Sequence, residues 1–359
     1  MASTDPDGGW YVRTGDHNGD RAPIRKALWA LDLHLIIASQ PTNTGRQYIP
    51  ALPIAMTASR PGADPAGAAR RMLAALALFG HAPGYLAGDN LYTLANPVAF
   101  QQPAKEMGWS LVLPYPQGHT GKQGSCGGAP LVEGQWCCPA MPESLVAATE
   151  DFRAKRIDLA TYRARIKKRN DYFLRAKESA DPGRAQRFMC PAAGASPTAK
   201  CLLKPHSTTP RLIHHVGTSQ ADLRPRISPD NELIAAPPMV CRQQTITIKA
   251  TEGAKYRQEL PFGSEEHTTI YYSLREAQEG MHGYAKNDAA EALHAKGRRR
   301  AHGLAQNSIQ AALLLACSGI RKVRSFLNEA VPDAKGILYK PVPNTRQRTP
   351  GAPGTETVT

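Results

Sequence analysis

The chain has 359 residues, of which 42% are hydrophobic, and this is enough for one large domain with an insertion or for two domains. Its formal net charge of +14 favours a polyanionic partner, most often nucleic acid, although a basic protein without such a partner is the alternative. No apolar run approaches the roughly 18 residues that span a bilayer, and the first residues do not form a signal peptide, so we expect no membrane association and a cytoplasmic location.

Strand and helix patterns alternate over the first third of the chain. Asp64-Pro65 is typical of a helix start, with a capping side chain followed by proline, and Gly80 of a helix end. The expected strands are 10–12, 27–38, 51–59, 84–87 and 109–113. The expected helices are 64–80 and 96–108. This order predicts an α/β layer architecture.

Residues 116–265 interrupt this alternation with dense glycine, proline and cysteine. One helix is expected between Glu150 and Glu178, with Leu159, Tyr162, Ile166 and Phe173 on one face. Between Asp151 and Ala180, ten Lys and Arg residues outnumber four Asp and Glu residues. Such a run is usually a solvated face, but beside a DNA-cutting site it could clamp the DNA backbone.

The helical pattern returns near residue 268 and lasts to about 327, and a Pro-, Thr- and Gly-rich tail after Pro332 is expected to be disordered. The predicted division of the chain is 1–115 for the first part of the core, 116–265 for the insertion, 266–330 for the helical end of the core and 331–359 for the tail.

Four polar residues in the late helical region have informative spacing. Arg275, Glu279 and Lys286 lie three, seven and fourteen positions after Tyr272, so on a helix the four residues fall within about 60° of one another. A hydroxyl, a guanidinium, a carboxylate and an ammonium on one face suit phosphates and a divalent cation. The simpler interpretation is a surface ion pair between Arg275 and Glu279.

Asp89 follows a short apolar strand, in the string Gly88-Asp89-Asn90-Leu91-Tyr92. Ligands gather at the carboxyl ends of strands in open α/β sheets, so Asp89 is a candidate metal ligand, although Asp-Asn is also common in ordinary turns. Together with Glu279 it could hold Mg²⁺ or Mn²⁺, which prefer carboxylate oxygens. Such ions activate a water or a hydroxyl for attack on a phosphodiester.

The spacing Y-(2)-R-(3)-E-(6)-K resembles, without a gap, the signature of a branch of DDE transposases from bacterial insertion sequences. The Gly88-Asp89-x-x-Tyr92 string resembles the second-aspartate motif of that branch. The resemblance covers about 27–327 and implies an α/β, ribonuclease-H-like core, a mixed sheet flanked by helices and interrupted by a large insertion. It also implies metal-dependent cutting and joining of DNA, with Asp89 and Glu279 as catalytic metal ligands. The residues expected to contact DNA are Tyr272, Arg275, Lys286, Arg298, Arg299 and Arg300.

The chain departs from that family at its start. The first catalytic aspartate belongs on a strand before residue 27, but Asp5 and Asp7 lie in a turn and Asp32 lies in what resembles the second core strand. We therefore expect a chain truncated at its N-terminus, without the first core strand. The functions left open are a transposase or transposase fragment that also joins DNA ends, an inactive DNA-binding remnant, and a nuclease without strand transfer. Two-ended transposition would require at least a dimer.

The cysteines offer a weaker hypothesis. Seven cysteines without an export signal argue against a disulfide framework. Cys190 and Cys201 could hold a structural Zn²⁺ with others, but there is no C-x₂-C pair, and free buried thiols are the preferred interpretation. The other candidates for this zinc site are Cys126, Cys137, Cys138, Cys241 and His206. Trp136 could stack on a base, but a core position is preferred.

Overall fold

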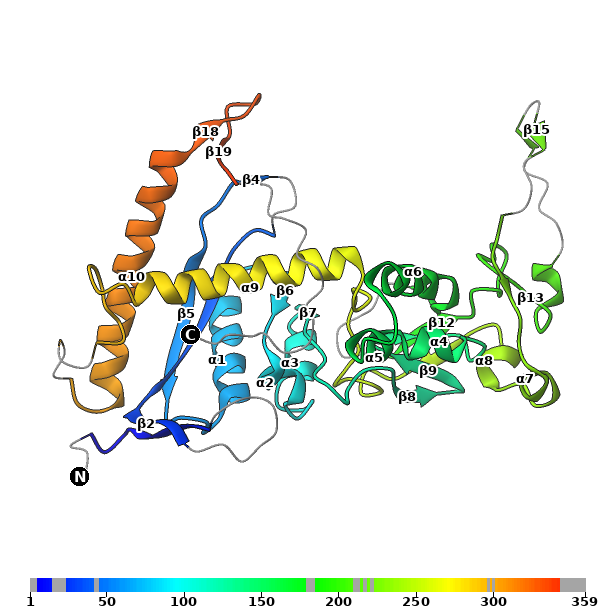
Figure 1. The fold of residues 1–359 in the computed structure, drawn as a ribbon, viewed down its shortest axis with the longest axis horizontal. Coiled ribbons are helices and arrows are strands. Elements are labelled where there is room, and N and C mark those ends of the chain that lie inside the picture. Colours follow the sequence, from blue (N-terminus) through cyan, green and yellow to red (C-terminus); the bar gives the residue numbers. More distant parts are fainter. Residues whose placement is uncertain are drawn as a thin grey trace. The chain divides into compact units, whose positions relative to one another are not determined.

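The protein is represented by a computed structural model that describes residues 5–14, 24–41, 45–178, 185–208, 214–215, 218–219, 223–295, 298 and 301–342. The fold is mixed α/β, and it divides into two compact units (Figure 1). The first unit is Met1–Ala87 with Thr268–Thr359, and the second is Gly88–His267, so the second unit begins earlier than the expected residue 116. Among the described residues, none of the helices is both long and apolar enough to cross a membrane.

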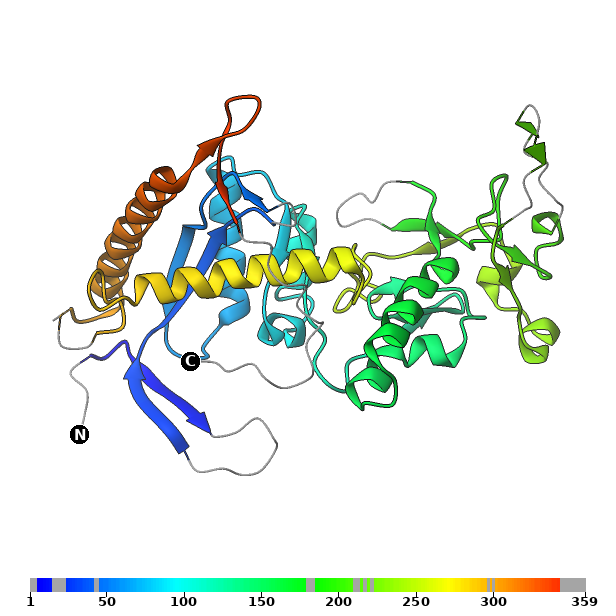
Figure 2. The same cartoon turned by 45° about the horizontal axis from the view of Figure 1, so that its top comes forward.

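The first unit combines several antiparallel strand pairings with helices (Figures 1 and 2). Its strands are β1 (Gly9–Thr14), β2 (Ile24–Ala30), β3 (Asp32–Ala38), β4 (Arg46–Gln47), β5 (Leu52–Ser59), β6 (Tyr85–Ala87), β18 (Val331–Pro332) and β19 (Leu338–Pro341). Its helices are α1 (Pro65–Leu78), α9 (Glu265–Ala285, from Thr268 onward) and α10 (Leu304–Glu329).

The single strand expected over 27–38 is two strands that meet at Leu31. β2 pairs antiparallel with β1, with Gly9 opposite Ala30, whereas β3 pairs antiparallel with β5, with Asp32 opposite Ser59. The hydrogen-bonding partner therefore changes at Leu31, and the apolar run continues across the change because both strands carry half-buried side chains. Sequence hydrophobicity reports burial, not which strand is the partner.

Helix α1 begins and ends close to the predicted positions. The Asp64 carboxylate accepts the Gly67 N–H at 2.8 Å, and Pro65 occupies the first turn, where its missing N–H has no cost. The helix buries Met72, Leu73 and Leu76 and contacts β5 and β3.

Helices α9 and α10 pack on the β3–β5 pair through a shared apolar cluster. Met281 and Ala285 of α9 and Leu315 of α10 are buried there. The strand side chains in the same cluster include Leu33, Leu35 and Ile37, which alternate along β3 and so share one face. This packing fixes the rotation of α9 about its axis.

The two early aspartates have a structural role at the start of α10. Helix α10 begins after Gly303, which has no side chain to cap it. The Asp5 carboxylate accepts the Gly303 N–H at 3.2 Å, and the Asp7 carboxylate accepts the Leu304 N–H at 2.7 Å. Both residues therefore satisfy N–H groups at a helix N-terminus, where negative charge is favourable.

The tail expected to be disordered begins with ordered structure. β18 and β19 form a small antiparallel hairpin, and β19 also pairs with β4. The Lys340 ammonium lies 2.6 Å from the Glu329 carboxylate at the end of α10. The hairpin is stabilised by this long-range pairing, which local composition does not report.

The second unit consists of short helices and small sheets. Its helices are α2 (Asn90–Leu94), α3 (Gln101–Glu106), α4 (Glu143–Val146), α5 (Ala148–Arg153), α6 (Leu159–Arg169), η1 (Asn170–Tyr172), η2 (Pro205–Ser207), α7 (Asn231–Ala235) and α8 (Met239–Arg242). Its strands are β7 (Ser110–Val112), β8 (Lys122–Cys126), β9 (Ala129–Val132), β10 (Gln135–Trp136), β11 (Arg175–Ala176), β12 (Gln186–Met189), β13 (Lys200–Cys201), β14 (His214–His215), β15 (Thr218–Ser219), β16 (Arg226–Ile227) and β17 (Ile246–Ile248). Two three-stranded sheets have the orders β10-β9-β8 and β11-β12-β17.

The helix expected between Glu150 and Glu178 is interrupted. Lys155 has a φ of +58°, which ends α5, and the Asp158 carboxylate then accepts the Thr161 N–H at 2.7 Å and starts α6. Tyr162 and Ile166 are buried as predicted, while Phe173 lies beyond the helix. Trp136 is only 4% exposed, which confirms its core position.

Candidate functional site

The helical region expected from about residue 268 to about 327 is two helices, α9 and α10, and the polar spacing pattern lies in α9. Tyr272, Arg275 and Glu279 lie within it. Lys286 directly follows its last residue, and the Lys286 N–H donates to the His282 carbonyl at 3.2 Å, so helical hydrogen bonding includes Lys286. The four backbone positions therefore have the helical spacing that places their side chains on one face.

Arg275 and Glu279 form an ion pair along this face. The Arg275 Nε lies 3.2 Å from a Glu279 carboxylate oxygen; the Arg275 side chain is 18% exposed and that of Glu279 is 62% exposed. The simpler interpretation offered by the sequence is thus present. A pair at this spacing contributes about 0.5 kcal/mol on an exposed helix surface, but here only Glu279 is exposed, so its carboxylate stays accessible to a cation while Arg275 is mostly buried.

Sequence reasoning missed one residue of this face, His282. Burial lowers the pKa of His282, the nearby charges of Lys286 and Arg275 lower it further, and Glu279 opposes them. The buried Nε2 of His282 makes no hydrogen bond within the described residues. The structure therefore groups a neutral imidazole with Arg275, Glu279 and Lys286, hereafter the α9 stripe. The signal was available, because position 282 has helical spacing from both 279 and 286.

The other residues that the sequence predicts to contact DNA are Tyr272, Arg298, Arg299 and Arg300. Tyr272 is half-buried, and its ring meets the Tyr271 ring edge-on with centroids 5.3 Å apart. Arg298 is exposed, whereas Arg299 and Arg300 lie outside the described residues.

Asp89 is the N-cap residue of the short helix α2 in the second unit. One of its carboxylate oxygens accepts the Leu91 N–H at 3.0 Å, so the ordinary turn weighed from the sequence is also present. Close packing explains the glycine at position 88, because a Cβ there would lie 2.8 Å from the Tyr92 ring. Burial, with the Asp89 charge as a second cause, raises the pKa of Tyr92 to about 12. The Gly-Asp-x-x-Tyr string is thus a local packing unit that presents a half-buried carboxylate.

The basic run at residues 151–180 is largely engaged within its own unit. The six members engaged with a carboxylate or a backbone carbonyl are Arg153, Arg156, Arg165, Lys168, Arg169 and Arg175. Arg169 is fully buried against Glu133 and cannot reach a ligand. The other four members, Lys155, Arg163, Lys167 and Lys177, are exposed, and so are Arg156 and Lys168 within their ion pairs. A backbone clamp on this segment would therefore rest on these six residues, not ten.

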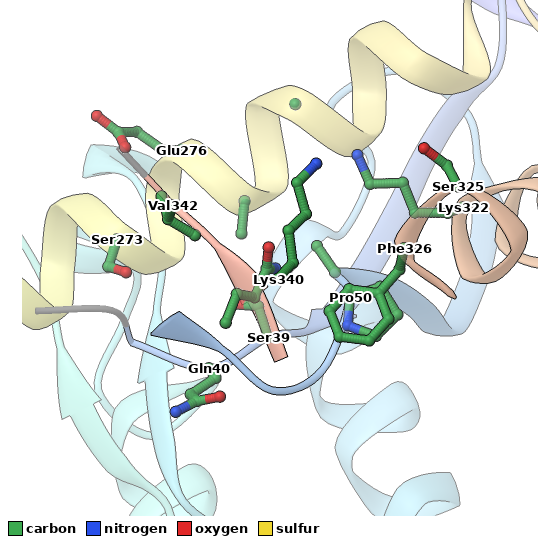
Figure 3. Close-up of a pocket in the computed structure, with 14 residues that line it drawn as sticks. Ser39, Gln40, Pro50, Ser273, Glu276, Lys322, Ser325, Phe326, Lys340 and Val342 are labelled. Carbon is green, nitrogen blue, oxygen red and sulfur yellow. The ribbon is translucent and has the colours of Figure 1, made fainter. Parts of the chain in front are cut away.

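A pocket of about 230 Å³ lies on another side of α9, within the first unit (Figure 3). Its walls include Glu276 and Gly280 of α9, Lys322 of α10 and Lys340 of β19. Burial lowers the pKa of Lys322, and the Lys340 charge lowers it further, which places the two ammonium groups near each other. At 100° per residue, Ser273, Ala277 and Gly280 point away from the α9 stripe, whereas Glu276 lies about 60° from Glu279, between the two faces.

All seven cysteines are free thiols, and five of them are buried. Within the described ranges, no three His, Cys, Asp or Glu side chains are arranged, as they stand, so that they could hold a metal ion. Asp89 and Glu279 both offer carboxylate oxygens, the donors that Mg²⁺ and Mn²⁺ take.

Comparisons with protein-family models, curated proteins and solved structures found no match for this chain. Its function therefore has to be inferred from its own residues.

Proposed function

We propose that this chain binds DNA and cleaves phosphodiester bonds with a divalent cation, as a transposase or a fragment of one. The observation that carries the proposal is the α9 stripe, which places a carboxylate, a guanidinium, an ammonium and a neutral imidazole side by side at helical spacing. The net charge of +14 supports a polyanionic substrate.

Each stripe residue has a role that follows from its chemistry. Arg275 can donate two parallel hydrogen bonds to phosphate oxygens, and Lys286, which is exposed, can hold a second phosphate as a point charge. His282 has a ring nitrogen available for one further polar contact. Tyr272 can donate its hydroxyl proton to a phosphate oxygen.

Glu279 of the first unit and Asp89 of the second unit are the carboxylates proposed to bind metal. Glu279 is largely exposed, and within the described residues its carboxylate pairs with Arg275. Asp89 uses one oxygen for the α2 cap. A bound Mg²⁺ or Mn²⁺ would supply an activated water or hydroxyl and stabilise the leaving oxygen. The ribonuclease-H-like core belongs to the same proposal, supported by the antiparallel β3–β5 pair that precedes α1.

Three early aspartates are not assigned to this site. Asp5 and Asp7 satisfy N–H groups at the start of α10, and Asp32 accepts the Gly62 N–H at 2.9 Å. The proposal therefore names two carboxylates.

A nicking assay on supercoiled plasmid tests the proposal. We expect Mg²⁺- or Mn²⁺-dependent nicking by the wild-type chain and its loss in Glu279→Gln and in Asp89→Asn. Glu276→Gln is the matched control, because Glu276 lies on the same helix and lines the pocket but is not a member of the α9 stripe. DNA binding, measured by fluorescence anisotropy, should survive all three substitutions.

The outcomes separate the alternatives. Binding without nicking would favour a non-catalytic DNA-binding remnant. Nicking without joining of cut ends to target DNA would favour a nuclease. Equal nicking by wild type and Glu279→Gln, or no DNA binding at low salt, would contradict the proposal.

A further inference from the structure

Four buried cysteines from distant segments of the second unit lie together. Cys138, Cys190 and Cys201 are packed in one buried cluster and Cys241 in a second one, and Leu203 packs against both clusters. The Cys138 and Cys190 side chains also interact with each other, and Cys241 interacts with Cys190 and Cys201. Exposure is 8% or less for all four side chains. They come from the segment after β10, the end of β12, β13 and α8.

Three of these cysteines occupy the same local backbone structure. Cys138, Cys190 and Cys201 each begin a tight turn. In each turn the carbonyl oxygen of the cysteine accepts a hydrogen bond from the backbone N–H of the third residue after it, with N···O distances of 3.0, 2.9 and 3.0 Å. In each turn the N–H two residues on donates to the cysteine sulfur; the donors are Ala140, Ala192 and Leu203. Cys138 and Cys190 share the sequence Cys-Pro-Ala, in which proline presets the turn.

This turn prepares a sulfur to carry negative charge. Backbone N–H groups directed at a sulfur stabilise a thiolate, and they are the outer contacts that orient metal ligands. A cysteine that serves only as a small apolar side chain has no need of such donors. The same turn at three of four clustered cysteines therefore points to a shared ligand.

Lys204 supplies a compensating charge. Its residue is buried, its ammonium donates to the Gln243 carbonyl at 2.9 Å, and its charge acts on Cys190, Cys201 and Cys241. A buried cation at this position is favourable beside a centre with net negative charge.

We propose that Cys138, Cys190, Cys201 and Cys241 form a structural Zn²⁺ site. Four thiolates suit this ion, and such sites are closed and structural. Binding converts four thiols and Zn²⁺ into a four-thiolate complex with net charge −2 and releases four protons. As they stand, no three of these side chains are arranged so that they could hold a metal ion. Coordination therefore requires the side chains to rotate as they lose their protons.

The other cysteines are outside this site. Cys137 is the informative case, because it is the immediate neighbour of Cys138 and fully buried, yet its thiol donates to the Gln135 carbonyl at 3.3 Å. Cys126 is half-buried, and Cys317 is exposed in the first unit. His206, also considered from the sequence, is exposed.

Metal analysis of the full chain tests the site. We expect one Zn²⁺ per chain after purification and dialysis without chelator, and its loss in Cys138→Ser, Cys190→Ser, Cys201→Ser and Cys241→Ser. Cys137→Ser is the matched control and should keep its zinc. Zinc well below one per wild-type chain, or full zinc in Cys138→Ser, would overturn the proposal.

A second measurement covers variants that fail to fold. Wild-type chain titrated with Co²⁺ should develop the intense visible and thiolate charge-transfer bands of tetrahedral sulfur coordination, which added Zn²⁺ should abolish. Absence of these bands in folded protein, or a Cys138–Cys190 disulfide found by mass spectrometry, would also contradict it. These readouts are independent of DNA cleavage.

Discussion

The guanidinium of Arg169 lies 2.5 Å from the carboxylate of Glu133, and these side chains are only 3% and 1% exposed. Glu133 also accepts the Thr149 hydroxyl at 2.7 Å and the Gly121 N–H at 3.0 Å. Arg169 donates to the Leu145 carbonyl at 2.8 Å. The pair thus joins α6 to the turn between β9 and β10, and its remaining polar atoms are bonded.

Removing one member of this pair should destabilise the second unit strongly. Arg169→Met leaves the Glu133 carboxylate buried without its cation, and breaking such pairs costs about 3–5 kcal/mol. Urea denaturation of the full chain would measure this loss of unfolding free energy. Arg187→Met, in a more exposed pair with Glu178, is the control and should cost far less. Equal losses in the two variants would show that burial does not set the energy of the Arg169 pair.

Lys105 should make the unfolding free energy depend on pH above neutrality. Burial, with the Arg257 charge as a second cause, lowers the pKa of Lys105 to about 7, while its amine donates to the Ala254 and Arg257 carbonyls at 2.9 and 2.6 Å. Between pH ~7 and ~10.5 the unfolded chain holds a proton on Lys105 that the folded chain lacks, so the unfolding free energy rises with pH.

Comparison with a variant isolates this contribution. Lys105→Met removes the titrating group, so the stability difference between wild type and variant should change across this window by up to about 1.4 kcal/mol per pH unit. Chemical denaturation from pH 6 to pH 10 would measure it. Lys122→Met, at an exposed residue, should leave the pH dependence unchanged. A wild-type curve parallel to that of Lys105→Met would mean that the Lys105 ammonium stays charged.

Lys286 should contribute to DNA affinity in a salt-dependent way. Each phosphate neutralised by a basic side chain adds about −0.9 to the slope of the logarithm of the association constant against the logarithm of the salt concentration. Lys286→Ala should therefore make this slope shallower by about one and weaken binding uniformly across DNA sequences. Lys335→Ala, at an exposed turn residue outside the α9 stripe, is the control. Identical slopes for wild type and Lys286→Ala would remove Lys286 from the DNA interface.

Local features were predictable because their causes are local. The Asp64 cap, the Pro65 position and the helical spacing of Arg275, Glu279 and Lys286 each depend on residues within one or two helical turns. His282 could have been found by the same spacing. It lies outside the signature that Tyr272, Arg275, Glu279 and Lys286 match, although it shares their face of the helix.

Pairings between distant segments were not predictable in this way. The sequence contains Gln258 and Leu113 but does not show that the Gln258 amide both accepts from the Leu113 N–H and donates to the Leu113 carbonyl. Nor does it show that Asp5 and Asp7 lie at the start of α10, or that the basic run is paired within its own unit. Each of these contacts depends on how the chain returns to itself.

The amino-acid sequence alone determined the net charge of the protein, because charge depends only on composition. It also determined the start of α1 and the polar stripe on a late helix, because helical backbone geometry repeats every few residues. Only the tertiary structure decided which cysteines meet, which cations are already neutralised and which strand β3 adopts as its partner. Those outcomes follow from long-range packing, in which residues far apart in the sequence compete for the same buried space.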